Sequence, residues 1–501
     1  MPEPLPRLSL ATLGRLASEH RGQVDPRALS IGVVHLGVGA FHRAHQAAYI
    51  ERAIERSGEA RWGICAVSER SSAAAAVLAA QDGLYSLRLA SPSSTSLRVL
   101  SVLREALFAR EQHEELRARL SDPAVSLVTL TVTEKGYRHD PATKRLLRSD
   151  EDLIADAAGR PPVSVIGQLV RGFEARRRAD AGPLTVLSCD NLPANGALLS
   201  DLVGEFLELP GTFDVGLAEW VAANVAFPCT MVDRIVPATS PADLAAAARA
   251  LGLVDEAAVV AEPFTQWVIE DCFLGPRPRL EEAGALLVDQ VAPYEMLKLR
   301  VLNASHSALA YLGALAGFEL IAEAVADPVF AAFVSNMVRD EVAPSLDPPP
   351  GVAVDAYRDE VLERFANPLL AHRCLQVASD GSQKLPQRVL GTIANRLAAG
   401  AAPRRLALVV AAYLRALREQ HNEMGQAIAI ADPLADVVRL AVSAADSPET
   451  IAERALSIEA IFGEDLGGDA RLRALLAEAL EALERAPVRE VVAAYAGGGG
   501  S

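Results

Sequence analysis

The chain has 501 residues, half of them hydrophobic, and its 48 basic and 64 acidic residues give a formal net charge of −16. A chain of this length exceeds what one compact core holds, so two or more domains are expected. Because binding a phosphate backbone takes clustered Lys and Arg, the acidic charge argues against a nucleic-acid partner.

The first part of the chain, up to about residue 290, alternates short β-branched runs with helical patterns. The predicted strands cover residues 31–36, 62–67, 84–89, 125–132 and 184–188. Helical patterns lie between them at residues 44–55, 73–80 and 112–120. This alternation predicts a parallel sheet with helices on both faces. Residues 1–290 are therefore predicted to form a Rossmann-like dinucleotide-binding domain of the α/β class.

Beyond residue 293, strand patterns nearly vanish and amphipathic helical patterns follow one another. These patterns cover residues 294–315, 318–325, 328–340, 354–365, 385–399, 403–419 and 469–485. They predict a mostly α-helical C-terminal domain, residues 291–495, for substrate binding and catalysis. The low-complexity end AGGGGS, residues 496–501, is expected to be a flexible tail.

The first predicted strand runs into a glycine turn and then a helix, in IGVVHLGVGAFHRAHQAAYIE (31–51). Glycines at such a turn let the backbone approach a pyrophosphate, so Gly37, Gly39 and the neighbouring Phe41 are candidate cofactor-binding residues. His42 stands where the third glycine of G-x-G-x-x-G would be. A plain strand–turn–helix without a ligand is the alternative interpretation.

The second predicted strand is followed by Glu69 and Arg70, two further cofactor-binding candidates. An acidic residue at this place binds the adenosine ribose of NAD, whereas an arginine can bind the 2′-phosphate of NADP. The pair therefore favours NAD and leaves NADP open. A solvated surface pair is the alternative interpretation.

Three histidines, His35, His42 and His45, raise the question of a metal site, because the last two share a helix face. No carboxylate or cysteine stands at ligand spacing nearby, and imidazoles beside a phosphate site can act as plain donors. No metal is therefore expected.

Polar residues also follow apolar runs at three further places, where parallel strands would present ligand-binding ends. These residues are Glu134 and Lys135, Asp190 and Asn191, and Asp233 and Arg234. Glu134 and Lys135 are assigned to the cofactor. A turn cap or a structural salt bridge is the alternative, above all for the pair at 233–234.

The stretch KLRVLNASH (298–306) places three polar residues in a core-facing helix: Lys298, Asn303 and His306. At 100° per residue they share one side of an α-helix. Lys298 among Leu, Val and Met is expected to have a lowered pKa, as a general base requires, and the other two can stabilise an alkoxide-like oxygen. Glu295 could pass the proton outward. The alternative is an amphipathic helix with a snorkelling lysine.

The remaining features predict a cytoplasmic protein without membrane contact. The longest apolar runs are shorter than the about 20 residues that span a bilayer. The start MPEPLPRLSL lacks a basic segment followed by an apolar one, so no secretory signal is expected. The five cysteines form no CxxC pair, which is typical of reduced thiols.

The chain resembles the mannitol dehydrogenase family, the polyol-specific long-chain dehydrogenases and reductases. The matching strings are HLGVGAFHRAHQAAY, TVTEKGY, SCDNLPANG, FPCTMVDRIVPAT, QWVIED, KLRVLNASHSALAYLG and DGSQKLP. They run in order from about residue 30 to 390, and weaker similarity continues to IFGEDL. The resemblance therefore covers nearly the whole chain.

The resemblance implies a zinc-independent, NAD(P)-dependent oxidoreductase that transfers hydride to or from a secondary alcohol of an open-chain polyol or sugar acid. By position, Lys298 resembles the family's general acid/base, Asn303 and His306 its oxyanion-stabilising pair, and Glu295 its proton conduit. The positions that resemble substrate contacts are Asn191, Asp233 and Lys384. A monomer or a weak homodimer is implied.

Substrate choice depends on residues 372–388, which are more similar to the fructuronate reductase branch. Gln376 stands where the mannitol enzymes carry an arginine, and Arg373 or Lys384 could supply the cation for a carboxylate. D-Mannonate/D-fructuronate is therefore favoured, and D-mannitol/D-fructose or arabinitol is the alternative. A non-catalytic nucleotide-binding protein would be expected to lose the lysine–asparagine–histidine set, which is intact here.

Overall fold

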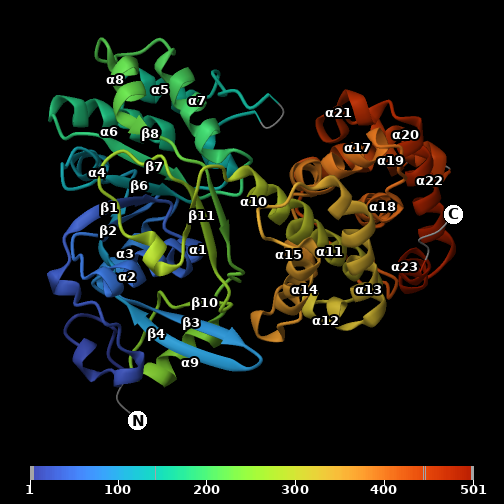
Figure 1. Cartoon of the computed structure of the whole chain (residues 1–501), viewed down its shortest axis with the longest axis horizontal. Helices are drawn as coiled ribbons and strands as arrows, with labels where there is room; N and C mark the ends of the chain where they lie inside the picture. Colours follow the sequence, from blue (N-terminus) through green and yellow to red (C-terminus); the bar gives the residue numbers. More distant parts are fainter. Residues whose placement is uncertain (1–4, 141–142, 444, 446, 498–501) are drawn as a thin grey trace. The chain divides into compact units, whose positions relative to one another are not determined.

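The computed structural model describes residues 5–140, 143–443, 445 and 447–497. The chain divides into two compact units, Met1–Val291 and Ala292–Ser501. Unit 1 is built around β-sheets, and unit 2 is built from helices (Figure 1). The predicted fold class, a Rossmann-like parallel-sheet domain followed by a mostly α-helical one, is thereby confirmed.

A six-stranded parallel sheet lies at the centre of the described part of unit 1, in the order β5-β2-β1-β6-β7-β8. Its strands are β1 (Ile31–Leu36), β2 (Gly63–Ser68), β5 (Leu103–Phe108), β6 (Leu127–Leu130), β7 (Leu184–Ser188) and β8 (Val225–Ala226). Val33 of β1 enters one hydrophobic core, and Val34 and Leu36 enter another. Because both faces of the sheet are buried, its strands are nearly continuous apolar runs.

The helices of unit 1 lie around its sheets (Figure 1). They are α1 (Ala40–Ala44), α2 (Gln46–Ser57), α3 (Ser72–Ala80), α4 (His113–Leu120), α5 (Glu151–Ala157), α6 (Val165–Arg178), α7 (Asn195–Leu207), α8 (Leu217–Asn224) and α9 (Pro241–Leu251). Apart from the six-stranded sheet, unit 1 contains a smaller sheet with the order β12-β11-β9. Its strands are β9 (Thr230–Asp233), β11 (Gln266–Glu270) and β12 (Leu286–Val288).

One predicted strand belongs to a different sheet from the one expected. The run at 84–89 forms β3 (Tyr85–Ser91), which pairs antiparallel with β4 (Ser94–Leu100) and parallel with β10 (Val259–Ala261). All residues of YSLRLAS are buried or half-buried, so this run does not by itself distinguish β3 from a strand of the main sheet. The main sheet contains β5 instead, a strand that the sequence pattern did not predict.

Unit 2 consists of helices packed around α11 (Figure 1). They are α10 (Ala292–Leu297), α11 (Ala304–Ala316), α12 (Ile321–Ala326), α13 (Pro328–Met337), α14 (Val354–Phe365), α15 (Cys374–Ala378), α16 (Gly381–Leu385), α17 (Gly391–Ala398), α18 (Arg404–Glu419), α19 (Ala435–Ser443), α20 (Pro448–Leu456), α21 (Glu459–Gly467), α22 (Ala470–Arg485) and α23 (Val488–Gly497). In the described part of unit 2, three π-helical segments interrupt them: η6 (Lys298–Asn303), η7 (Val338–Val342) and η10 (Pro386–Leu390). The segment η6 packs against both of the others.

The C-terminal residues differ in part from the expectation. The last helix, α23, ends at Gly497 and so includes the first two residues of the predicted flexible tail, whereas 498–501 lie outside the described residues. All five cysteines are free. Within the described ranges, no helix is long and apolar enough to cross a bilayer.

Candidate active site

The turn after β1 requires glycine at one position and leaves space at another. Gly37 has φ +95°, and a Cβ there would lie 2.2 Å from the carbonyl oxygen of Thr131, so a side chain is excluded on both counts. At Gly39 the backbone is extended, and a Cβ would meet nothing nearer than Gly37 O at 3.8 Å. The space beside Gly39 is therefore a cradle that a side chain would fill and that a pyrophosphate can approach.

The helix after this turn is interrupted. The sequence predicts one helix over 44–55, whereas α1 ends at Ala44 and α2 begins at Gln46, with a non-helical backbone at His45 between them. The Nε2 of His45 donates to the Gln266 carbonyl at 2.8 Å, which ties the break to β11. Phe41 stacks on His45 with ring centroids 5.0 Å apart, so this candidate residue is fixed beside the glycine turn.

Two histidines near this turn, His35 and His42, are packed as neutral rings. His35 bonds to the hydroxyls of Thr129 (2.7 Å) and Thr131 (3.0 Å), and burial lowers its pKa to about 3. His42 stacks on His35 at 3.3 Å between centroids, and burial holds its pKa well below the ordinary value. Among the described residues, no group of three His, Cys, Asp or Glu side chains is placed to hold a metal ion.

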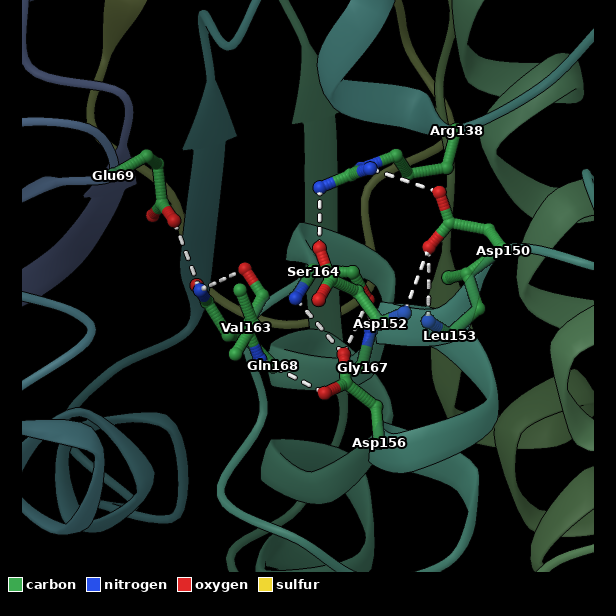
Figure 2. Close-up of polar contacts among 10 residues, drawn as sticks. All are labelled: Glu69, Arg138, Asp150, Asp152, Leu153, Asp156, Val163, Ser164, Gly167 and Gln168. Carbon is green, nitrogen blue, oxygen red and sulfur yellow. Dashed lines mark hydrogen bonds and ion pairs between the residues drawn. The ribbon is translucent and has the colours of Figure 1, made fainter.

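Glu69 and Arg70 bond in different directions after β2. Glu69 Oε2 accepts from Gln168 Nε2 at 2.8 Å (Figure 2), whereas Arg70 donates to Thr133 Oγ1 at 2.8 Å. Oε1 of Glu69 is buried and has no partner among the described residues. Burial raises the pKa of Glu69 to about 7, and the contacts with Gln168 and Arg110 act against that rise. An unpaired buried oxygen at this place fits a ribose hydroxyl.

The segment after β6 is anchored by Asp190. Its carboxylate accepts from the Thr133 amide at 2.9 Å and from the phenol of Tyr137 at 2.8 Å. Thr133 has φ +66°, which is strained for a β-branched residue and is a feature of functional sites. Thr133 leads into a short 3₁₀ turn on which Glu134 is half-buried and Lys135 is exposed.

The end of β7 is joined to β9 by a residue that the sequence analysis did not single out. Asn195 donates to the carbonyls of Asp190 (3.0 Å) and Thr230 (2.9 Å), and its own oxygen accepts from the Thr230 amide at 2.9 Å. Asn191, the predicted substrate residue, is exposed in the same loop. The string SCDNLPANG contains both asparagines, but nothing in it distinguishes the structural one.

Asp233 and Arg234 are both buried, and they differ in role. Asp233 ends β9, opposite Gln266 of β11. The guanidinium of Arg234 donates to the backbone carbonyls of Ala44 and Glu262, and burial lowers its pKa to about 10. Arg234 therefore holds the break after α1 in place through backbone carbonyls.

In unit 2, the lysine–asparagine–histidine set spans a π-helical segment and the α-helix that follows it. Lys298, Asn303 and His306 are 6%, 7% and 8% exposed. The Ala304 amide donates to Leu299 O, five residues back. In a π-helix, residues five apart lie on the same face of the helix, as residues four apart do in an α-helix. Lys298 and Asn303 are thus on one face, closer in angle than the expected α-helix would place them.

The ring of His306 is enclosed by aromatic groups. It stacks on Phe365 with centroids 4.5 Å apart and meets His372 edge to face at 4.7 Å. Burial, together with the charges of nearby cations, holds the pKa of His306 well below its ordinary value. Its Nε2 has no partner among the described residues. A neutral ring with an unused nitrogen can donate to a substrate oxygen. Glu295, the fourth candidate, is half-buried on α10.

The string HRCLQVASDGSQKLPQR divides into surface and interior residues. Arg373 pairs with Glu319 at 3.0 Å, with side chains 67% and 63% exposed, and Gln376 is exposed as well. The structure therefore brings neither residue into contact with His306. Their outward direction follows from the short helix α15, whose buried side packs on α11.

Other residues of this string lie close to His306. Lys384 donates from Nζ to the Ser379 carbonyl at 2.6 Å, and Arg388 donates to Ser307 Oγ at 3.2 Å. The charges of Lys384 and Arg388 lower the pKa of His306. Lys384 is predicted from the sequence, whereas Arg388 and His372 are not, although all three stand in the same string. Listing every Lys and Arg of that string would have indicated Arg388 as a further candidate.

Two family models match the chain. The model described as "Mannitol dehydrogenase Rossmann domain" covers residues 31–282, and "Mannitol dehydrogenase C-terminal domain" covers residues 290–484.

Individual proteins match over most of their length. The mannitol 2-dehydrogenase of Phaeosphaeria nodorum is 41% identical over 471 residues, 93% of this chain and 81% of that protein. The D-mannonate oxidoreductase of Escherichia coli is 40% identical over 479 residues, 94% of this chain and 96% of that protein. The mannitol 2-dehydrogenase of Pseudomonas fluorescens, solved as a ternary complex with NAD and D-mannitol, matches with a TM-score of 0.88 and 34% identity, covering 97% of this chain and 98% of that one.

Proposed function

This chain belongs to the mannitol dehydrogenase family of oxidoreductases, and we propose that it interconverts an open-chain sugar acid and its keto form with NAD as hydride carrier. The observation that carries the proposal is the surroundings of His306. The Nε2 of this neutral ring has no hydrogen-bond partner among the described residues. The nearby cations Arg388 and Lys384 lower the pKa of the ring. A neutral donor suits an alkoxide-like oxygen, and the cations suit a carboxylate.

The proposed proton transfer uses the residues of η6 and its neighbours. Lys298 Nζ takes the proton of the reacting hydroxyl. Asn303 Nδ2 and His306 Nε2 donate hydrogen bonds to the oxygen as it becomes alkoxide-like and then a carbonyl. Glu295, three residues before Lys298, passes the proton on towards water. In the reductive direction the same groups return the proton to the oxygen.

The proposed cofactor is NAD. The cradle beside Gly39 and the unpartnered Oε1 of Glu69 fit a pyrophosphate and a ribose hydroxyl. When bound, NAD accepts the hydride at its nicotinamide ring. The other residues proposed for this half are Gly37, Phe41, Arg70, Glu134 and Lys135. The acid–base and oxyanion roles are all assigned to side chains, so the proposal includes no metal.

The proposed substrate pair is D-mannonate and D-fructuronate. A terminal carboxylate needs a cation, and Lys384 and Arg388 supply two beside His306, whereas Gln376 is neutral. Asn191 and Asp233 are proposed to bind hydroxyls. D-Mannitol and D-fructose are the second candidate pair, favoured by relatives that are named mannitol 2-dehydrogenases.

Absorbance of the reduced nicotinamide tests the proposal directly. Purified protein is mixed with NADH and either fructuronate or fructose, and with NAD and either mannonate or mannitol. We expect a higher kcat/KM with fructuronate than with fructose. A higher kcat/KM with fructose would replace the sugar-acid proposal by the mannitol one, and absence of turnover with all four would overturn both.

A further inference from the structure

Gln168 lies in the first turn of α6, and two acceptors orient its amide. Nε2 donates to Glu69 Oε2 at 2.8 Å and to the Val163 carbonyl at 3.5 Å. Because a carboxylate and a carbonyl only accept, the group facing them is the NH₂, and Oε1 is the opposite end of the amide. Oε1 is buried and has no partner among the described residues.

A series of buried contacts fixes the start of α6 (Figure 2). Ser164 accepts from the Gly167 amide at 3.0 Å and donates to Asp156 Oδ2 at 2.6 Å. Asp156 is fully buried and also accepts from the amides of Val163 (2.9 Å) and Ser164 (2.8 Å). A Cβ on Gly167 would lie 2.3 Å from Asp156 Oδ2, so glycine permits this approach. Gln168 therefore stands on a rigid first turn.

The support for this turn extends to the segment after β6. Asp150 caps α5 by accepting from the amides of Asp152 (3.0 Å) and Leu153 (3.1 Å). Arg138 then pairs with Asp150 at 2.8 Å and with Asp152 at 2.7 Å (Figure 2). Because α5 ends at the carboxylate that holds the start of α6, the position of Gln168 is set by several elements at once.

Two buried acceptors, Glu69 Oε1 and Gln168 Oε1, thus lie near the end of β2, and the described part of the chain supplies no donor to either. Buried acceptors are normally paired, so the pair indicates a ligand that brings hydroxyl or amino groups. A ribose with an attached base has donors of both kinds.

We propose that Gln168 is a cofactor-binding residue, which holds Glu69 in place and accepts a hydrogen bond from the adenosine part of the dinucleotide, so that the two residues select NAD against NADP. This inference rests on the proposed function. The 2′-phosphate of NADP has acceptor oxygens and negative charge, and it would face two acceptors, one of them a carboxylate.

The pH midpoint of NAD binding depends on the charge state of Glu69. A purely structural role of Gln168 would leave this midpoint unchanged. The charge of Arg110 affects the pKa of Glu69, and α6 contributes the Gln168 hydrogen bond. The helix α3, which packs on β2, contains no charged residue. The Gln168 hydrogen bond counteracts the raised pKa of Glu69. Its loss should raise that pKa further, so the pH midpoint of NAD binding should move upward.

The test measures NAD and NADP affinity by quenching of tryptophan fluorescence across a pH series. Gln168→Met keeps the volume and removes donor and acceptor. We expect its Kd for NAD to rise at least about tenfold, its Kd for NADP to rise less, and its pH midpoint to increase. Gln81→Met is the matched control, because Gln81 is another buried glutamine, bonded to Asp255 and Leu84 at 2.8 Å. This control variant should lower the Tm and leave the ratio of the Kd values for NAD and NADP unchanged.

The outcomes separate the two proposals. If the wild-type protein does not bind NAD, the proposed function itself is overturned. If the wild type binds NAD and Gln168→Met retains both the Kd ratio and the pH midpoint, Gln168 has only a structural role. Should Gln168→Met fail to fold, Gln168→Glu places a second carboxyl against Glu69. Its Kd for NAD should also rise, and an unchanged Kd would contradict the inference.

Discussion

Lys298 and Asn303 stand at the two ends of one π-helical segment, five residues apart and on one face of the helix. An α-helix would turn the amide of Asn303 well away from the lysine, because five residues at 100° each overshoot one full turn by about 140°. The wider turn therefore allows one small substrate group to meet both side chains. π-Segments of this kind occur frequently at functional sites.

Replacement of Lys298 tests its proposed role as the acid/base. Lys298→Met should lower kcat by roughly 10²–10⁴-fold, the usual contribution of general acid–base catalysis. NAD affinity, measured by fluorescence quenching, should not change, because the lysine acts in the chemical step. Lys144→Met, at an exposed lysine of unit 1, is the control and should retain full turnover. Near-wild-type kcat in Lys298→Met would remove the lysine from the mechanism.

The two glycines of the β1 turn should respond differently to alanine. Gly39→Ala has space in the protein alone, so its Tm should stay near the wild-type value while NAD binding weakens, because the Cβ fills the cradle. Gly37→Ala should lower the Tm, since it combines φ +95° with a contact of 2.2 Å to Thr131 O. Thermal unfolding and NAD titration of both variants check this. Unchanged NAD affinity in Gly39→Ala would argue against a pyrophosphate at this turn.

Removal of a cation beside His306 should lower kcat/KM more for a sugar acid than for its uncharged counterpart. Lys384→Met and Arg388→Met should each reduce kcat/KM for fructuronate roughly ten- to hundredfold, the range expected for a lost hydrogen bond to a charged group. The loss with fructose should be smaller. Arg373→Met is the matched control, because that guanidinium is exposed and paired with Glu319. Equal losses for both substrates would contradict a carboxylate-binding role.

The pH dependence of stability can be tested at Glu51, which is fully buried on α2. Its Oε2 accepts from the amides of Ser101 (2.6 Å) and Val102 (2.9 Å), and burial raises its pKa from 4.5 to about 7. Between those values the folded protein holds a proton that the unfolded chain releases, so this group's contribution to stability falls as pH rises from 4.5 to 7. Glu51→Gln lacks this dependence.

The Tm of the Glu51→Gln variant relative to wild type should therefore increase across that window and level off above it. Thermal unfolding of both proteins at a series of pH values provides the measurement. A Tm difference independent of pH would show that Glu51 titrates normally in the folded protein.

The sequence by itself determined the parallel sheet of unit 1 in outline and the glycine turn after its first strand. Runs such as IGVVHL are apolar without alternation, and only a strand buried on both faces requires this, so the parallel sheet could be predicted. Gly37 could be identified because its place after the first strand demands a backbone that few residues adopt. The amphipathic periods after residue 293 likewise predicted helices, because they extend over many turns.

The tertiary structure decided what local patterns leave open. The run of β3 is compatible with either sheet, and only its pairing with β4 and β10 assigned it to a separate one. KLRVLN contains no signal for a π-helix, since its hydrogen-bond register depends on packing against η7 and η10. Gln168 and Arg388 look like ordinary helix-surface residues until α6 is placed beside β2 and η10 beside α11. Side-chain direction depends on contacts between residues distant in sequence, and a local pattern carries no record of those contacts.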